Sequence, residues 1–313
     1  MKVISIGEVL WDVVGSEEHL GGASFNFSAH LTRLGHEVSF VSAVGEDDRG
    51  RRILQRMQHL GISTAFVRRV PDHATGIVTV TLRAGGQPEF VLHRPAAYDF
   101  PELTTAQMER LLAQPPEWIY YGTLHQMSPA AKELTARLLH ASTNARRFYD
   151  VNLRQSSWTP ELVRELMAQA TVVKLNEDEV GEIAHSLGTR HESLEGFCRS
   201  YAARFGWQGV CITRGVLGCA LFLNGEYIQA EGYPVKVADA VGAGDAFAAA
   251  LLHGLGQGWR PARMADFANR VGALVASRRG AIPEWTLGEA EALQHEPQHP
   301  APQHHVSGHK ETA

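Results

Sequence analysis

The chain has 313 residues, of which 44% are hydrophobic and 20% charged, so it can bury the core of one large globular domain or two modest ones. Its 29 basic and 34 acidic residues give a formal charge of -5, which disfavours nucleic acid and anionic membranes as main partners. Three cysteines without CxxC spacing indicate neither a disulfide scaffold nor a zinc knuckle and fit a reducing cytosol.

Membrane and export signals are weak. No stretch approaches the roughly 18 uninterrupted apolar residues of a bilayer span. The acidic Glu8 interrupts the N-terminal apolar run too early for a secretory leader. We therefore expect a soluble, uncleaved, cytoplasmic protein without a membrane partner.

Short runs rich in β-branched and aromatic residues alternate with segments of helical periodicity. The predicted strands are 3–6, 38–44, 118–121, 147–151, 172–175 and 210–213. The predicted helices include 23–34, 50–60, 130–139 and 160–169. Such alternation is typical of βαβ units and predicts an α/β fold around a mostly parallel sheet.

One segment breaks this alternation. Two predicted strands, 76–82 and 89–94, flank a turn that contains Gly85 and Gly86. Because a hairpin does not easily join a sheet of βαβ units, we expect it to form a separate flap.

The C-terminal end has almost nothing apolar to bury. We place the end of the folded domain at residue 290 and expect a disordered His/Pro-rich tail over 291–313. Five of the 16 histidines lie in this tail, but its composition favours a solvated segment over a metal site.

The strongest local signal is the string Asp-Ala-Val-Gly-Ala-Gly-Asp over 239–245, followed by an apolar helix-forming run. We expect Gly242 to Asp245 to lie at a helix N-terminus, where unpaired N–H groups and the helix dipole favour an anion. The residues alone leave two interpretations of Asp245. It is either an N-cap or a base placed against a transferring phosphoryl group.

With the motifs around it, this string resembles the signature of the ribokinase/PfkB carbohydrate kinase family. The resemblance spans roughly residues 1–290, and the matching segments occur in the family's order: 7–12, 21–26, 150–154, 176–179, 213–218 and 239–245. It implies a ribokinase-like, three-layer α/β/α fold with a mostly parallel central sheet. It also implies a small β lid contributed by about 10–22 and 72–98, and a homodimer formed through that lid.

The resemblance assigns the catalytic centre and the ATP site. It makes Asp245 the base that takes a proton from a sugar hydroxyl. The N–H groups of Ala243, Gly244 and Asp245, with Gly242 forming the turn, would hold the γ-phosphate. The residues it assigns to the nucleotide are Lys174, Asn176, Glu179, Thr213, Gly215, Gly218 and Asn269. Without the family, 176–179 would be read as an acidic helix start and 213–218 as a strand end with a turn.

Two metal ions are implied in the same way. Glu179 would orient Mg²⁺ largely through water, which suits an ion that keeps much of its hydration shell. In many relatives a K⁺ loop is formed around positions that correspond to Asp239, Val241 and the segment 276–282. Ala240 stands where a threonine is common, so K⁺ activation is left open.

The resemblance places the acceptor sugar at Asp12, Gly21, Gly22, Asn26, Arg94, Tyr98 and Arg154. A carboxylate at position 12 could accept sugar hydroxyls, and Asn26 offers a donor and an acceptor together. Taken one by one, these residues would instead be read as a surface acid, a turn and polar helix positions. Closure of the flap over the sugar would exclude water.

We therefore expect an ATP-dependent sugar kinase that phosphorylates a primary hydroxyl of a monosaccharide. Similarity to fructokinase-like members favours fructose. The second candidate acceptor is 2-keto-3-deoxygluconate, because Arg94 and Arg154 could pair with its carboxylate. Ribose, a nucleoside and a sugar phosphate remain open. The alternative of another class is a sugar-binding regulator that has lost turnover.

Overall fold

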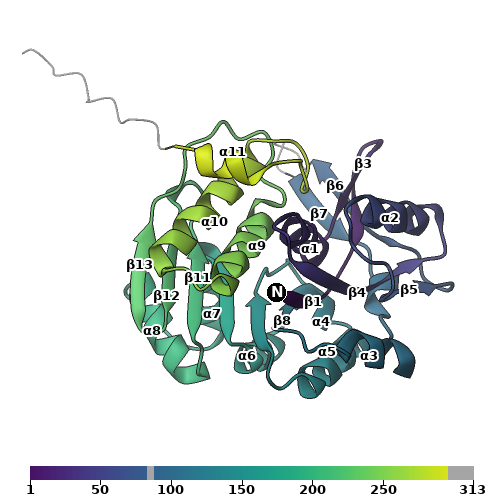
Figure 1. Cartoon of the computed structure of the whole chain (residues 1–313), viewed down its shortest axis with the longest axis horizontal. Helices are drawn as coiled ribbons and strands as arrows, with labels where there is room; N and C mark the ends of the chain where they lie inside the picture. Colours follow the sequence, from purple (N-terminus) through teal and green to yellow (C-terminus); the bar gives the residue numbers. More distant parts are fainter. Residues whose placement is uncertain (83–87, 295–313) are drawn as a thin grey trace, which may run out of the picture.

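Two sheets of unequal size organise the chain in the computed structural model, which describes residues 1–82 and 88–294 (Figure 1). The strands of the large sheet are β1 (Lys2–Ile6), β4 (Glu37–Gly45), β5 (Val67–Val70), β8 (Trp118–Gly122), β9 (Arg146–Asp150), β10 (Val172–Asn176), β11 (Gly209–Thr213), β12 (Cys219–Leu223) and β13 (Glu226–Ala230). Their order across the sheet is β13-β12-β11-β10-β9-β8-β1-β4-β5. The pairs β11–β12 and β12–β13 are antiparallel and the other pairs are parallel, so the predicted mostly parallel sheet is confirmed.

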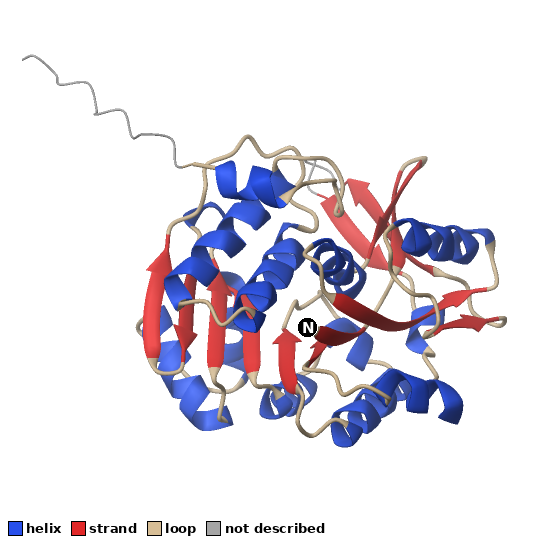
Figure 2. Ribbon diagram, in the orientation of Figure 1, coloured by secondary structure: helices blue, strands red, loops and turns tan. Residues whose placement is uncertain are grey.

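Helices cover both faces of this sheet. They are α1 (Ala23–Arg33), α2 (Asp48–His59), α3 (Thr105–Leu112), α4 (Thr123–Gln126), α5 (Pro129–Ala141), α6 (Pro160–Gln169), α7 (Glu177–Ser186), α8 (Leu194–Phe205), α9 (Ala243–Gly256), α10 (Pro261–Ala276) and α11 (Leu287–Ala292), with 3-10 turns at Ala97–Asp99 and Gly215–Leu217. Figure 2 shows α1, α9 and α10 on one side of the sheet and α6 to α8 on the other. This is the expected three-layer α/β/α arrangement.

Strand alternation sends neighbouring side chains into two separate cores. Tyr120 and Phe148 face α1, where the Phe27 ring stacks on Tyr120 with 3.7 Å between ring centroids. Tyr121 and Tyr149 point the opposite way and join the core under α5 to α8. Because each strand buries both faces, these segments read as continuous apolar runs.

The small sheet contains β2 (Leu10–Val14), β3 (Glu17–Gly21), β6 (Gly76–Leu82) and β7 (Pro88–Leu92), in the order β3-β2-β6-β7. The two strands of the predicted flap pair antiparallel, while Gly85 and Gly86 lie outside the described residues. So does the tail from residue 295 on. Helix α11 runs to Ala292, two residues past the predicted domain end.

Parallel strands bring their carboxyl ends to one edge of the sheet, and this edge carries the candidate site. Asp150 ends β9 and lies opposite Lys174 of β10 in the strand register. Asn176 ends β10 opposite Thr213, the last residue of β11. Among the described residues, no helix is both long and apolar enough to cross a bilayer.

Candidate active site

Helix α9 begins at the expected position. Gly242 precedes it with a φ of +79°, and among the described residues no side chain caps its first turn. The N–H groups of Gly244 and Asp245 therefore point outward without a helical partner. The N–H of Ala243, predicted to join them, instead donates to the carbonyl of Ala240 at 3.3 Å. Two donors, rather than three, are free for an anion.

Asp245 lies in the first turn of α9 and is only 8% exposed. One oxygen of its carboxylate accepts a hydrogen bond from Nδ2 of Asn26 at 2.8 Å. Burial and the nearby carboxylate of Asp150 raise the pKa of Asp245 to about 6, against the lowering effect of the Asn26 bond. Asp245, the predicted base, is thus hydrogen-bonded to Asn26 of α1, which was predicted to bind the sugar. Asp245 does not act as an N-cap, because Gly242 holds that position.

A buried ion pair lies beside this turn. The Nζ of Lys174 is 2.9 and 3.1 Å from the two carboxylate oxygens of Asp150, which also accepts a hydrogen bond from the Tyr120 hydroxyl at 3.2 Å. Burial alone would lower the pKa of Lys174, but Asp150 and Glu179 outweigh it and raise the pKa. A Cβ built on Gly244 would lie 3.7 Å from this ammonium group. A fixed positive charge therefore stands next to the free N–H groups.

Asn176 and Glu179 form a reciprocal capping box at the start of α7. The Asn176 side chain accepts from the N–H of Glu179 at 2.9 Å, and Glu179 accepts from the N–H of Asn176 at 2.7 Å. The second oxygen of Glu179 accepts from the N–H of Leu153 at 2.7 Å. Both carboxylate oxygens are thus fixed by backbone donors, each with a lone pair left for water.

The oxygen atoms around Glu179 indicate how a Mg²⁺ ion could be bound. Among the described residues, no group of three or more His, Cys, Asp or Glu side chains is placed to hold a metal ion. The residues therefore fit an ion carried by nucleotide phosphates and water, with Glu179 outside its inner shell, better than an ion in a protein cage.

The segment predicted to bind the nucleotide lies at the end of β11. Thr213 is its last residue. Gly218 has a φ of +91°, and a Cβ there would lie 2.1 Å from the carbonyl oxygen of Ala230, so glycine is required at this position. Asn269 of α10 donates to the carbonyls of Ala230 and Glu231 at 3.3 and 3.0 Å. Asn269 therefore braces the end of β13, and its predicted place near the adenine stays a prediction.

The sugar residues predicted near the N-terminus gather around the small sheet. Asp12 lies on β2, the strand that follows β1 in the chain. Its carboxylate faces Gly21 of β3, where a Cβ would come within 2.4 Å of it. Gly22 has a φ of +106° and passes so close to the carbonyl of Glu8 that any side chain would collide with it. Burial raises the pKa of Asp12 to about 6, although Arg154 and His19 lower it.

Arg154 connects this region electrostatically with Asp245. It lowers the pKa of Asp12, of Asp245 and of Glu8, so all three carboxyl groups lie within electrostatic range of its guanidinium group. Within the described parts of the chain, Arg154 is exposed and forms no ion pair. Asp12 and Asp245 consequently border the same charged region.

Two flap residues predicted to contact the sugar are engaged elsewhere. Arg94 pairs with Asp99 through Nε at 3.2 Å and a terminal nitrogen at 2.5 Å, and donates to the carbonyl of Leu124 at 3.2 Å. Tyr98 is 1% exposed and packs against Leu10. Through these contacts both residues stabilise the fold beneath the small sheet. Their contact with substrate stays a prediction.

The loop predicted for K⁺ is assembled from the two expected segments. The carboxylate of Asp239 accepts from the N–H groups of Val241 and Gly280 at 3.0 and 3.1 Å. Ala281 then packs directly against Gly242, where a Cβ would lie 2.4 Å from its carbonyl oxygen. The loop therefore supports the turn in front of α9, and its occupancy by K⁺ stays a prediction.

Sequence reasoning missed two buried acids as members of the site. Glu8 is 4% exposed, accepts from the N–H of Ala23 at 2.9 Å, and has a pKa raised by burial. Asp150 was noticed only as part of a motif, although it neutralises Lys174 and acts on Asp245. Both follow apolar strand runs, and that position was the available signal.

Comparison with known proteins identifies the chain. Residues 4–287 match the model of the pfkB family of carbohydrate kinases, which covers most of the sequence. The chain belongs to this family. It is therefore a sugar kinase, and the alternative of a regulator without turnover loses its support.

Relatives of this pfkB kinase have different acceptors in their names. It is 30% identical to the aminoimidazole riboside kinase of Salmonella typhimurium, over 90% of this chain and 91% of the relative. It is 28% identical to fructokinase-1 of Oryza sativa subsp. japonica, over 90% of this chain and 93% of the relative. A fructokinase of Xylella fastidiosa with bound ATP superposes with a TM-score of 0.82 at 22% identity, covering 93% of this kinase and 97% of that chain. At that identity the superposition confirms the fold.

Proposed function

We propose that this kinase transfers the γ-phosphoryl group of ATP to a primary hydroxyl of a monosaccharide, with fructose as the first acceptor to test. The observation that carries the proposal is the position of Asp245. Its carboxylate is buried beside the two free N–H groups of α9 and is held by Asn26 from the sugar side.

The proposed chemistry needs little from the protein except alignment and charge. The hydroxyl oxygen of the sugar attacks the γ-phosphorus, the bond to the bridging oxygen of ADP breaks, and the hydroxyl proton passes to Asp245. The N–H groups of Gly244 and Asp245, together with Lys174, stabilise negative charge on the transferring group. A pKa of about 6 leaves Asp245 ionised near neutral pH and ready to accept the proton.

The nucleotide is proposed to lie across the ends of β10 and β11. Glu179 would hold water around a Mg²⁺ ion, whose role when bound is to neutralise phosphate charge. Val216 and Leu217 follow Thr213 and are 74% and 58% exposed, leaving apolar surface that an adenine ring could cover. K⁺ between Asp239 and the segment 276–282 is part of the same proposal.

The choice of fructose as the acceptor rests on the names of relatives such as the rice fructokinase-1. One structural observation favours a different acceptor class. Arg154 is exposed, lacks an ion pair among the described residues and borders the site, so it could pair with the carboxylate of an acidic sugar such as 2-keto-3-deoxygluconate. One relative is named an aminoimidazole riboside kinase, so a nucleoside is included among the acceptors to be tested.

We further propose that the small sheet is a lid that closes over the sugar. It carries Asp12, and a homodimer formed through this lid is part of the same proposal. The buried free thiols Cys198, Cys211 and Cys219 support a reducing, cytoplasmic location.

Release of ADP with a panel of acceptors tests the substrate. The panel contains fructose, ribose, 2-keto-3-deoxygluconate and a nucleoside, each at equal concentration with ATP and Mg²⁺. The proposal predicts the highest kcat/KM for fructose. A strong preference for the acid would replace fructose, and Arg154→Gln should then raise KM for the acid much more than KM for fructose.

A further inference from the structure

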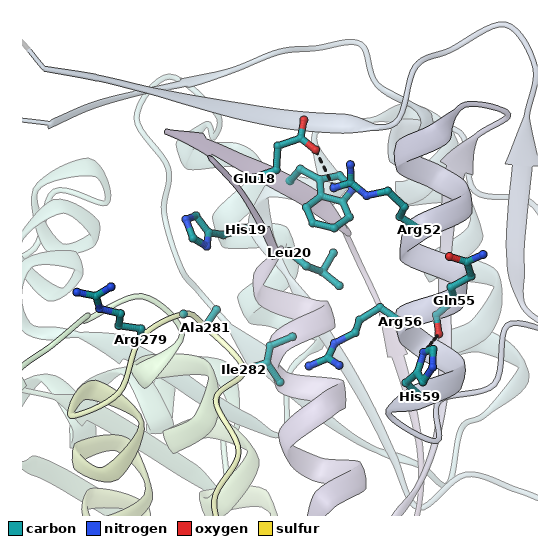
Figure 3. A pocket seen from close by; sticks show the side chains of 12 residues that line it. Glu18, His19, Leu20, Arg52, Gln55, Arg56, His59, Arg279, Ala281 and Ile282 are labelled. Atoms are coloured by element: carbon teal, nitrogen blue, oxygen red, sulfur yellow. Dashed lines mark hydrogen bonds and ion pairs between the residues drawn. The ribbon is translucent and has the colours of Figure 1, made fainter. Parts of the chain in front are cut away.

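A cavity lies beside the small sheet, and Asp245 is not among the residues that line it. Its volume is about 540 Å³, and it lies between β3, α2 and the loop 279–282 (Figure 3). Cavities that bind small molecules commonly measure about 300–1,000 Å³. The cavity is therefore large enough for a metabolite of the size of a sugar phosphate.

Trp11 and Leu20 place part of this cavity on the face of the small sheet opposite to Asp12. In the register of β2 and β3, Trp11 pairs with Leu20 and Asp12 with His19. Side chains alternate along a strand, so Trp11 and Leu20 share a face that Asp12 does not share. Trp11 and Leu20 line the cavity from that face. His19, which shares the face of Asp12, also lines it, so the cavity reaches around the edge strand β3 and adjoins the region of Asp12 there.

The walls of the cavity are predominantly basic. Its one acid, Glu18, is already paired with Arg49 and Arg52, at 2.6 and 2.7 Å. Arg56 from α2 and Arg279 from the loop also line it, and within the described residues neither forms an ion pair. Arg56 extends toward Ile282 across the cavity (Figure 3). Positive charge thus remains without a counter-charge at this place.

Further basic groups add to this charge. Burial lowers the pKa of Arg33 on the neighbouring helix α1, Glu284 raises it, and Arg56 and Arg278 lower it, so Arg56 lies within electrostatic range of another guanidinium group. Between the arginines, Leu20 and Ile282 supply apolar surface. An arginine-lined cavity with an apolar floor suits an anion attached to a small carbon skeleton, and guanidinium groups bind phosphate with a matching geometry.

We propose that this cavity, with Arg56 and Arg279, is a second binding site that takes a sugar phosphate. The choice of sugar phosphate rests on the proposed function, because the reaction releases that class of compound. The position of the site gives it a route to catalysis. One wall is β3, which pairs with the strand of Asp12, and the other is the loop whose Gly280 holds Asp239 and whose Ala281 supports Gly242.

Calorimetric titration with fructose 6-phosphate tests the site. The wild type is compared with the double variant Arg56→Gln/Arg279→Gln. The control is Arg51→Gln, on the same helix but outside the cavity. None of the substituted residues is among those proposed to contact the sugar or ATP. Because Arg279 belongs to the segment 276–282, the Kd for ATP is measured in all three proteins to check that the catalytic site is intact. Melting temperatures of the three proteins check that each variant is folded.

We expect the double variant to bind fructose 6-phosphate at least about tenfold more weakly than the wild type, while Arg51→Gln matches the wild type. Fructose without phosphate should show no difference among the three proteins. Equal binding of fructose 6-phosphate by all three, or no saturable binding by the wild type, would overturn the proposal. Because binding needs no turnover, these outcomes are independent of whether fructose is the acceptor.

Discussion

The carboxylate of Asp245 is subject to opposing effects. Burial and Asp150 favour its neutral form, while the hydrogen bond from Asn26 and the charges of Lys174 and Arg154 favour its ionised form. The result is a pKa of about 6, above the ordinary value of 3.8. A base with this pKa is ionised at neutral pH and still holds a proton better than an exposed aspartate does.

The dependence of kcat/KM on pH should report this pKa. Because the base must be ionised, we expect kcat/KM to fall as the pH drops through about 6. Asp12, with a pKa also of about 6, adds a second titrating group, so Asp12→Asn should make the fall less steep. A profile that stays flat until about pH 4, the range of ordinary aspartates, would contradict this assignment.

His30 provides a second residue-scale prediction. It accepts from Nε1 of Trp285 at 3.0 Å and donates to the carbonyl of Ala281 at 3.0 Å, so it is neutral and tied to the loop behind Gly242. Burial lowers its pKa from 6.5 to about 4. The unfolded chain therefore takes up a proton first as the pH falls. His30 contributes its full stability above pH 6.5 and loses it toward pH 4.

Urea unfolding at two pH values measures this effect. Between pH 7 and pH 5 the wild type should lose about 2 kcal/mol more free energy of unfolding than His30→Gln, which cannot titrate there. An equal loss in both proteins would show that His30 is not held neutral by the fold.

At the scale of elements, the turn into α9 combines two glycines with different constraints. Gly242 needs its positive φ, and a Cβ there would lie 2.4 Å from the carbonyl oxygen of Ala281. Gly244 has neither constraint, since its Cβ would be 3.7 Å from Lys174, an ordinary contact. Its N–H, however, points into the proposed phosphate site.

The substitutions Gly242→Ala and Gly244→Ala should have different effects on stability and on activity. We expect Gly242→Ala to lower both the melting temperature and kcat, because the turn must distort. Gly244→Ala should leave the melting temperature within a few degrees of the wild type but reduce kcat/KM for ATP, because its methyl group occupies space beside the γ-phosphate. If Gly244→Ala keeps full activity, the phosphate does not lie against this turn.

At the scale of the whole molecule, the small sheet and the large sheet provide the two sides of the site. Asp12 belongs to the small sheet, whereas Asp150 and Lys174 belong to the large one and Asp245 lies on a helix covering it. The proposed function predicts that a sugar bound between them draws the two parts together and excludes water.

Hydrogen exchange can detect this closure. With fructose and a non-hydrolysable ATP analogue both present, we expect slower amide exchange in β2 and β3, while exchange in β12 and β13 stays the same. Either ligand alone should have a smaller effect on β2 and β3. Unchanged exchange in the small sheet with both ligands would mean that it does not close.

The alternation of strands and helices, the flap strands and the start of α9 could all be predicted from the sequence, because each depends on local patterns. Pairings between distant residues could not. The bond from Asn26 to Asp245 joins positions 219 residues apart. Arg94 and Asp99 are close in the sequence, but their pairing depends on how the backbone turns between them, which residue types do not determine. The use of the Ala243 N–H in a turn likewise depends on backbone angles that residue types do not determine.

The central claim is that Asp245 removes the proton from the sugar hydroxyl. Its most direct test compares Asp245→Asn with the wild type in ADP release and in ATP binding. The account predicts that kcat falls about 10²- to 10⁴-fold, the usual contribution of a general base, while the Kd for ATP changes little. A variant that turns over as fast as the wild type would contradict it.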